Sequence, residues 1–117
     1  MDINALQKEI ATFASERDWE KFHTIKNLVL ALVGEAGELA SVVQWLENVD
    51  KEFLDSNMEI RQNLSEELAD VFIYLLRIAD VSGIDILEAT QEKLKKNGLR
   101  YTVEKSFGNA KKQYWLD

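Results

Sequence analysis

Two stretches of the sequence decide the fold: residues 28–46 read LVLALVGEAGELASVVQWL, and residues 64–78 read LSEELADVFIYLLRI. In both stretches apolar residues recur every three or four positions, which is the spacing of one face of an α-helix. The chain has no proline and only five glycines. No strand-like alternation of apolar and polar residues appears. The sequence therefore predicts an all-α fold.

Outward from these stretches, the same spacing and the polar or glycine residues at its ends predict four helices, at about residues 3–17, 24–47, 56–81 and 86–97. Thr24, Ser56 and Asp85 are the predicted N-caps, because their side-chain oxygens can accept a hydrogen bond from the first turn. Gly83 and Gly98 are the predicted helix ends. Residues 48–57 are expected to form a polar turn. Helices of this number and length are typical of a small antiparallel four-helix bundle.

The length of 117 residues corresponds to one domain, with a core at about residues 3–105 and a polar tail at residues 106–117. The chain has no cysteine, which excludes disulfides and cysteine-based zinc sites. The first residues lack the basic and apolar regions of a signal peptide, and no apolar run is long enough for a membrane span. We therefore expect a cytoplasmic protein with no membrane partner. The net charge of −7 argues against nucleic acid as a partner.

Each of the two central stretches carries a pair of acidic residues three positions apart, so that both members project from one side of a helix. The pairs are Glu35 with Glu38 and Glu67 with Asp70, and both lie on the apolar stripe. No lysine or arginine occurs in residues 27–50 or 62–76. Burying an ionised carboxylate without a partner costs several kcal/mol or more. Two facing helices would converge these acids on one point, which suits a hard cation such as Mg²⁺, with Mn²⁺ as a possible substitute.

Two other interpretations of the acids compete with a cation site. Acidic residues are common on surfaces, and one such pair alone would be explained best as solvated surface charge. A di-iron carboxylate bundle needs a Glu-x-x-His motif on two helices. The only histidine of the chain, His23, lies outside both acidic pairs, so the di-iron interpretation fails.

The run GEAGEL at residues 34–39, followed about thirty residues later by EELAD at residues 66–70, resembles the signature of the MazG-like all-α nucleoside triphosphate pyrophosphatases. The residues around it resemble the dCTP pyrophosphatase branch. They are FASERDW at 13–19, FH at 22–23, NL at 27–28, QW at 44–45, VFIYL at 71–75 and the segment 93–101. The resemblance covers about residues 5–105. Residues 47–56 depart from it, because they lack the glycine- and proline-rich turn expected in animal relatives.

The resemblance implies hydrolysis of a nucleoside triphosphate between the α and β phosphates, with Mg²⁺ held by Glu35, Glu38, Glu67 and Asp70. A carboxylate beside the metal, Glu35 or Glu38, could take the proton of the attacking water, and the sequence does not choose between them. The residues that fall where relatives bind base and sugar are Trp19, His23, Asn27, Trp45 and Tyr74. Donors to the β and γ phosphates are expected from Lys93, Asn97, Arg100 and Tyr101.

The resemblance also implies a homo-oligomer, either a dimer or a tetramer made of two dimers. The expected reaction converts dCTP, or a modified dCTP, to the monophosphate and pyrophosphate. One alternative is the same chemistry on dUTP or on a broad set of nucleoside triphosphates. Another is a non-enzymatic helical interaction module whose acids serve solubility or partner charge.

Overall fold

The structure is a computed structural model that describes residues 1–113, so the last four residues of the predicted polar tail lie outside it. The described chain contains six α-helices and one short 3₁₀ helix. They are α1 (Ile3–Glu16), η1 (Glu20–Phe22), α2 (Ile25–Val43), α3 (Lys51–Asp55), α4 (Met58–Ser82), α5 (Ile86–Arg100) and α6 (Val103–Ser106). No strand occurs in residues 1–113, which confirms the all-α prediction for them.

The chain divides into two compact units, one comprising Met1–Gly83 and the other beginning at Ile84. The first unit contains α1 to α4, and the second contains α5 and α6. A four-helix bundle would require α5 to pack on the first unit, so the bundle and its oligomer stay predictions, as does the single domain.

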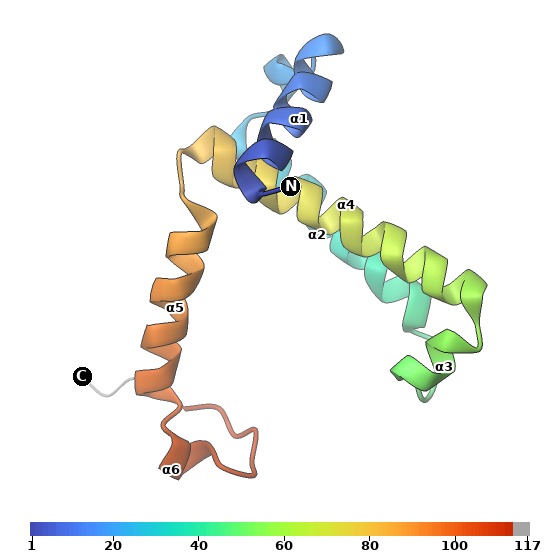
Figure 1. The fold of residues 1–117 in the computed structure, drawn as a ribbon, viewed down its shortest axis with the longest axis vertical. Helices are drawn as coiled ribbons and strands as arrows, with labels where there is room; N and C mark the ends of the chain where they lie inside the picture. The colour runs from blue at the N-terminus through green and yellow to red at the C-terminus, as the bar shows by residue number, and fades with distance from the viewer. Residues whose placement is uncertain (114–117) are drawn as a thin grey trace. The chain divides into compact units, whose positions relative to one another are not determined.

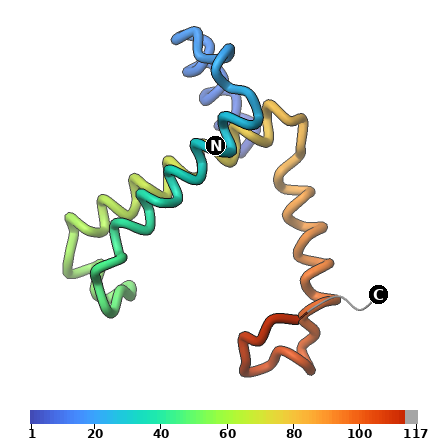
Figure 2. Tube along the Cα trace, turned by 180° about the vertical axis from the view of Figure 1, so that it is seen from behind, coloured from blue at the N-terminus to red at the C-terminus, as the bar shows by residue number. Residues whose placement is uncertain are grey.

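The centre of the first unit is the pair α2 and α4, which lie side by side over most of the length of α2 (Figures 1 and 2). The two helices are antiparallel, because His23, two residues before α2, contacts Arg77 near the end of α4. Helix α1 packs on the last turns of α4, where the side-chain amide of Gln7 donates a hydrogen bond to the carbonyl of Leu76 (3.1 Å). The small buried core lies at this junction and comprises Ala14, Leu28, Leu76 and Ala79.

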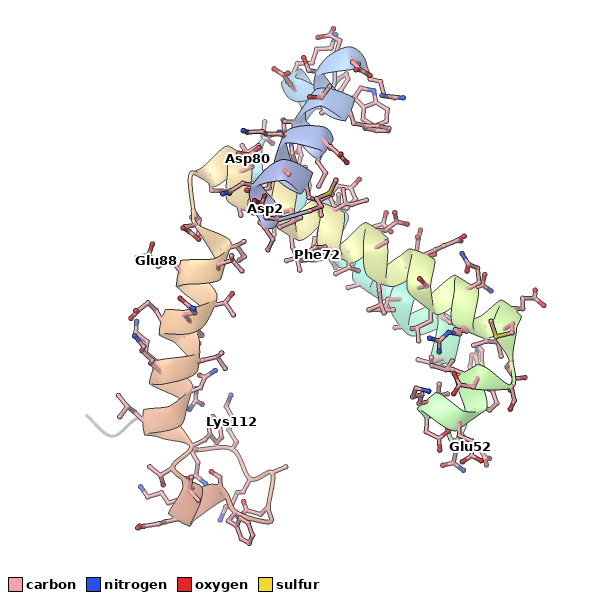
Figure 3. All side chains as sticks on the ribbon, in the orientation of Figure 1. Asp2, Glu52, Phe72, Asp80, Glu88 and Lys112 are labelled. Carbon is pink, nitrogen blue, oxygen red and sulfur yellow. The ribbon has the colours of Figure 1, made fainter. Side chains whose placement is uncertain are left out.

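Side-chain oxygens cap most of these helices, and two of the caps, Thr24 and Asp85, are those that the sequence predicts. Thr24 accepts a hydrogen bond from the Asn27 backbone (3.1 Å), and Asp85 accepts one from Glu88 (3.1 Å). Asp2, labelled in Figure 3, caps α1 through the Ala5 backbone (2.7 Å). Such caps contribute about 1 kcal/mol each, because they satisfy a backbone donor that the helix leaves free.

Three features between residues 43 and 56 differ from the prediction. Helix α2 ends at Val43, four residues before the predicted end at Glu47, and residues 51–55 form α3 where only a turn was expected. Asp50 explains α3, since its carboxylate accepts a hydrogen bond from the Phe53 backbone (2.8 Å). Ser56 is the C-cap of α3, so its assignment as the N-cap of the next helix is wrong.

The two glycines predicted to end helices behave differently. Gly83 ends α4 with φ of 67°, in the left-handed region that glycine enters without steric cost. Gly98 was expected to end the next helix, but α5 continues to Arg100. Gly98 lies outside the left-handed region and accepts the helical backbone, at a cost of about 1 kcal/mol relative to alanine.

In the described part of the chain, no helix combines the length and the apolar character needed to cross a membrane. Both central helices nevertheless expose apolar side chains. Val29, Leu30 and Val33 of α2 are 43–65% exposed, and Leu68, Phe72 and Leu75 of α4 are 39–52% exposed.

Candidate active site

Three carboxylates converge between α2 and α4. One oxygen of each of Glu35, Glu38 and Glu67 lies within 4.8 Å of the other two. Glu35 and Glu38 share a face because they are three residues apart on α2, and the antiparallel α4 presents Glu67 to the same point. Asp70, the fourth predicted acid, lies outside this group of three. Its charge still acts on Glu35 and on Glu67, so it belongs to the same electrostatic environment.

Burial divides the acids into two kinds. Glu35 and Glu67 are half-buried, and the Oε2 atom of each is buried with no hydrogen-bond partner within the described chain. Glu38 and Asp70 are exposed. No lysine or arginine of residues 1–113 forms an ion pair with any of the four. The centre of the α2–α4 pair therefore holds a concentration of negative charge that the described residues leave uncompensated.

The electrostatic consequence is visible in the two half-buried acids. Burial raises the pKa of Glu35 above its ordinary value, and the charges of Glu38 and Asp70 raise it further. Burial is also the main cause that raises the pKa of Glu67, followed by the charges of the same two neighbours. Each acid thus resists ionisation because negative groups face it and no positive group offsets them.

The donor set fits a hard divalent cation. Convergent carboxylate oxygens are the ligands that Mg²⁺ and Mn²⁺ prefer. The unpartnered Oε2 atoms of Glu35 and Glu67 supply the lone pairs, and a cation between them would lower both raised pKa values. Glu35, Glu38 and Glu67 could hold such an ion, with Asp70 beside them.

A second group of predicted site residues lies at the beginning of α2. The chain leaves α1 through Asp18, whose φ of 53° is in the left-handed region that aspartate tolerates. This turn places the ring of Trp19 edge-on against Phe13, with centroids 5.7 Å apart. His23 also contacts the indole, at 6.4 Å between centroids. Trp19 remains 43% exposed, so part of its surface is free to contact a ligand.

His23 is held by a residue that sequence reasoning did not select. The Nε atom of Arg77 donates a hydrogen bond to Nδ1 of His23 (3.1 Å). Arg77 is buried on α4, and its guanidinium also pairs with Asp80 at 3.5 Å between Nη1 and Oδ2. A signal was available, because Arg77 is a charged residue on the same apolar stripe as Glu67 and Asp70. Its partner could not be identified in advance, because His23 lies 54 positions away in the sequence.

The remaining predicted contacts of the first unit differ in their placement. Asn27 is exposed, and its side-chain amide donates to the Phe22 carbonyl (3.1 Å). Tyr74 is half-buried on α4, one turn beyond Asp70. Trp45 was expected on the helical stripe two turns from Glu38, and that placement is wrong. Helix α2 ends at Val43, and the indole of Trp45 is 87% exposed in the turn that follows.

The four predicted phosphate donors lie in the second unit. Lys93 and Asn97 stand one turn apart on α5 and line a shallow hollow together with Ile86, Ala89, Thr90 and Leu94. Arg100 is the last residue of α5, and its guanidinium carbon lies 5.3 Å from the centre of the Tyr101 ring. Arg100 also donates to the Gln113 carbonyl. Their role as phosphate donors stays a prediction.

The chain matches one protein family and is similar in sequence to named members of known function. Residues 23–102 match the family described as the MazG nucleotide pyrophosphohydrolase domain. The chain is 44% identical to dCTP pyrophosphatase 1 of Rattus norvegicus over 109 residues, which are 93% of this chain. It is 40% identical to the human protein of the same name over 111 residues, or 95% of this chain.

A solved structure is also similar. A pyrophosphatase from Archaeoglobus fulgidus superimposes with a TM-score of 0.75 at 37% identity, covering 85% of this chain and 91% of that one. The chain spans 62% of the length of the rat relative and 64% of the human one.

Proposed function

Because this chain belongs to the MazG nucleotide pyrophosphohydrolase family, we propose that it hydrolyses a nucleoside triphosphate to the monophosphate and pyrophosphate. The observation that carries the proposal is the convergence of Glu35, Glu38 and Glu67 between facing helices, with two buried oxygens that have no partner in residues 1–113. A surface charge cluster would leave its oxygens in water, whereas these two require a cation or a proton.

The proposed substrate is dCTP or a modified dCTP. The named relatives at 40–44% identity are dCTP pyrophosphatases, and the similarity extends over more than nine tenths of this chain. The same chemistry on dUTP or on several nucleoside triphosphates is the alternative within the enzyme class, and a nucleotide panel separates the two.

The proposed cofactor is Mg²⁺, held by Glu35, Glu38 and Glu67 with Asp70 beside them. The chemistry that a bound divalent cation supplies here is neutralisation of phosphate charge and a lower pKa for the attacking water. The protein's own part is to orient that water and take its proton. We assign the proton transfer to Glu35 or Glu38. The water oxygen bonds to the α phosphorus. The bond from that phosphorus to the oxygen that bridges the α and β phosphates breaks, and pyrophosphate leaves.

The nucleoside end of the site is proposed to lie at the beginning of α2. Trp19 presents a partly exposed indole supported by Phe13, and a base stacked on it gains about 1–3 kcal/mol. His23 and Asn27 follow it at the beginning of α2, and Tyr74 lies on α4 between the carboxylates and this end. Trp45 lies beyond the opposite end of α2 from Trp19, so its proposed contact to the base or sugar is to a nucleotide held by a second copy of the chain.

The proposed assembly is a homo-oligomer, a dimer or a tetramer of two dimers. It is supported by the exposed apolar stripes, Val29, Leu30 and Val33 on α2 and Leu68, Phe72 and Leu75 on α4. A second copy that covers these stripes removes apolar area from water at about 25 cal/mol per Å². Light scattering on the protein as it elutes from a size-exclusion column should give a mass above that of one chain. Phe72→Glu should reduce that mass and Asn63→Glu, at an exposed polar position of α4, should not.

The experiment that tests the function measures pyrophosphate release from a panel of ribo- and deoxynucleoside triphosphates, with Mg²⁺ and with Mn²⁺. We expect metal-dependent release, highest with dCTP or 5-methyl-dCTP. Release from dUTP or several triphosphates at equal rates would replace the dCTP assignment. If no triphosphate yields pyrophosphate and Mg²⁺ does not raise the melting temperature, the acidic interaction module becomes the better account.

A further inference from the structure

The contact between Arg77 and His23 fixes which ring nitrogen of the histidine carries the proton. Arginine offers only donors and stays protonated at every pH at which the protein is folded. Its Nε–H lies 3.1 Å from Nδ1 of His23, so Nδ1 must supply the lone pair. A neutral imidazole with an unprotonated Nδ1 carries its hydrogen on Nε2. The ring is therefore a donor at Nε2.

The surroundings also keep the ring neutral. Burial lowers the pKa of His23 below 6.5, and the positive charge of Arg77 lowers it further. From the other side, Glu20 of η1 raises it, which is the smallest of the three effects. Asp80 forms an ion pair with Arg77. The doubly protonated ring would place two positive groups in contact, and it would lose the lone pair that accepts from Arg77.

The Nε2–H group is left available. No second hydrogen bond to the His23 ring occurs within residues 1–113, and Nε2 is not among the buried atoms that lack a partner. The ring is half-buried and contacts the edge of Trp19, which is partly exposed. A ligand that stacks on Trp19 therefore comes within reach of a fixed hydrogen-bond donor.

We propose that Arg77 is a positioning residue that holds His23 in the Nε2–H tautomer, as a donor to a hydrogen-bond acceptor on the base or sugar of the nucleotide. The identity of the ligand rests on the proposed function. Arg77 follows Asp70 by seven residues, which is two turns and about 10 Å along α4. This separation places the donor at the nucleoside end when the phosphates are at the carboxylates.

The tautomer has a consequence for base selection. A fixed N–H donor pairs with a carbonyl oxygen, a sugar oxygen or an unprotonated ring nitrogen, and it opposes an N–H group. Cytosine offers acceptors at both O2 and N3, whereas N3 of uracil carries a proton. Both bases present two acceptors and one donor on the pairing edge, so His23 in this tautomer favours cytosine over uracil in a contact at N3 and does not discriminate between them at O2 or at the sugar.

The test uses the single histidine of the chain. In protein labelled with ¹⁵N-histidine, the ring gives one pair of nitrogen signals, so no assignment is needed. We expect the wild-type protein near pH about 7.5 to show a protonated Nε2 and an unprotonated Nδ1, and to titrate below 6.5. A protonated Nδ1, or signals averaged between the two tautomers, would overturn the proposal without the need for any variant.

Two arginines of α4 provide a matched pair of variants. Arg77→Met removes the donor and its charge, so the tautomers should mix and the titration midpoint should move toward 6.5. Arg61→Met removes an exposed arginine that pairs with Asp55 (3.2 Å), so the histidine signals should stay unchanged. An unchanged tautomer in a folded Arg77→Met protein would contradict the positioning role.

A second experiment adds dCMP together with Mg²⁺. The proposed reaction does not consume dCMP, so the bound state can be observed. Binding should slow solvent exchange of the Nε2 proton and shift its signal while the tautomer stays the same. Arg77→Met should raise KM for dCTP about tenfold with a smaller change in kcat, because a binding contact is lost. If dCMP quenches tryptophan fluorescence yet leaves the Nε2 signal unmoved, the donor role is wrong. If the tautomer is as expected but no triphosphate is hydrolysed, the proposed function fails and the Arg77–His23 assignment stands.

Discussion

The α2–α4 pair contains buried charge of two kinds, one near α1 and one toward the middle of the pair. At the end near α1, the buried Arg77 has both of its partners within the protein, His23 at 3.1 Å and Asp80 at 3.5 Å. Toward the middle, Glu35 and Glu67 keep buried oxygens with no partner in the described residues, and their neighbours are also acidic. The first arrangement is complete as it stands. The second becomes favourable only when a cation joins it, which is what distinguishes a structural charge from a binding site.

The largest expected effect comes from removing one member of the carboxylate cluster. Glu67→Gln should lower kcat for triphosphate hydrolysis by about 100-fold or more, because a ligand oxygen and its charge are lost. Glu66→Gln changes the neighbouring exposed acid, which lies outside the group of three, and should alter kcat by less than about threefold. Steady-state assays of pyrophosphate release compare the two variants. Equal losses would show that charge, and not the position of Glu67, matters.

The next effect concerns Arg77, whose partners both lie within the protein. Arg77→Met should lower the free energy of unfolding by about 2 kcal/mol, because His23 and Asp80 lose the hydrogen bond and the ion pair that the buried arginine makes with them. Arg61→Met removes a surface ion pair and should cost less than about 1 kcal/mol. Urea denaturation of both variants measures the difference. A smaller loss for Arg77→Met than for Arg61→Met would contradict the contrast between a buried and a surface arginine.

When no metal is present, a substitution in the carboxylate cluster should increase stability instead of lowering it. In EDTA, Glu67→Gln should raise the melting temperature, since it removes a half-buried charge that faces Glu38 and Asp70. Addition of Mg²⁺ should raise the melting temperature of the wild-type protein and leave that of the variant almost unchanged. Thermal unfolding followed by circular dichroism tests both statements. A variant destabilised in EDTA would show that Glu67 has a favourable partner within the protein.

The smallest effect is the pH dependence contributed by His23. Its pKa in the folded protein is below 6.5, so its contribution to stability is fully present above 6.5 and is lost as the pH falls through the lowered value. His23→Gln keeps an acceptor for Arg77 and cannot titrate. The wild-type melting temperature minus that of His23→Gln should therefore decrease between pH about 7.5 and about 5.5. A difference that stays constant or increases would mean that the ring is not held neutral.

The parts of the fold that were predicted correctly depend on local chemistry. Thr24 and Asp85 cap their helices, and Gly83 ends α4, because each effect needs only a few neighbouring residues. The end of α2 at Val43 was missed because the periodic apolar pattern continues to Leu46 although the helix does not. Gly98 was misassigned because a glycine ends a helix only when its backbone turns left-handed, and composition does not reveal φ.

The candidate site also contains features that the sequence predicts and features that it does not. The convergence of Glu35, Glu38 and Glu67 could be predicted, because these acids lie on the apolar stripes through which the two helices face each other. The position of Asp70 outside the group of three depends on side-chain geometry that helical spacing cannot supply. Arg77 was passed over because its partner is distant in sequence, so its role becomes visible only once α1 and α2 are folded against α4.

The most direct test of the account is cation binding by the carboxylate cluster itself, measured without any substrate. Titration of Mn²⁺ followed by the loss of its free-ion electron paramagnetic resonance signal gives the bound fraction. We expect the wild-type protein and Glu66→Gln to bind Mn²⁺ and to release it to excess Mg²⁺, and we expect Glu67→Gln not to bind it. Equal binding by all three proteins, or none by the wild type, would contradict the claim that the unpartnered carboxylates between α2 and α4 form a divalent-cation site.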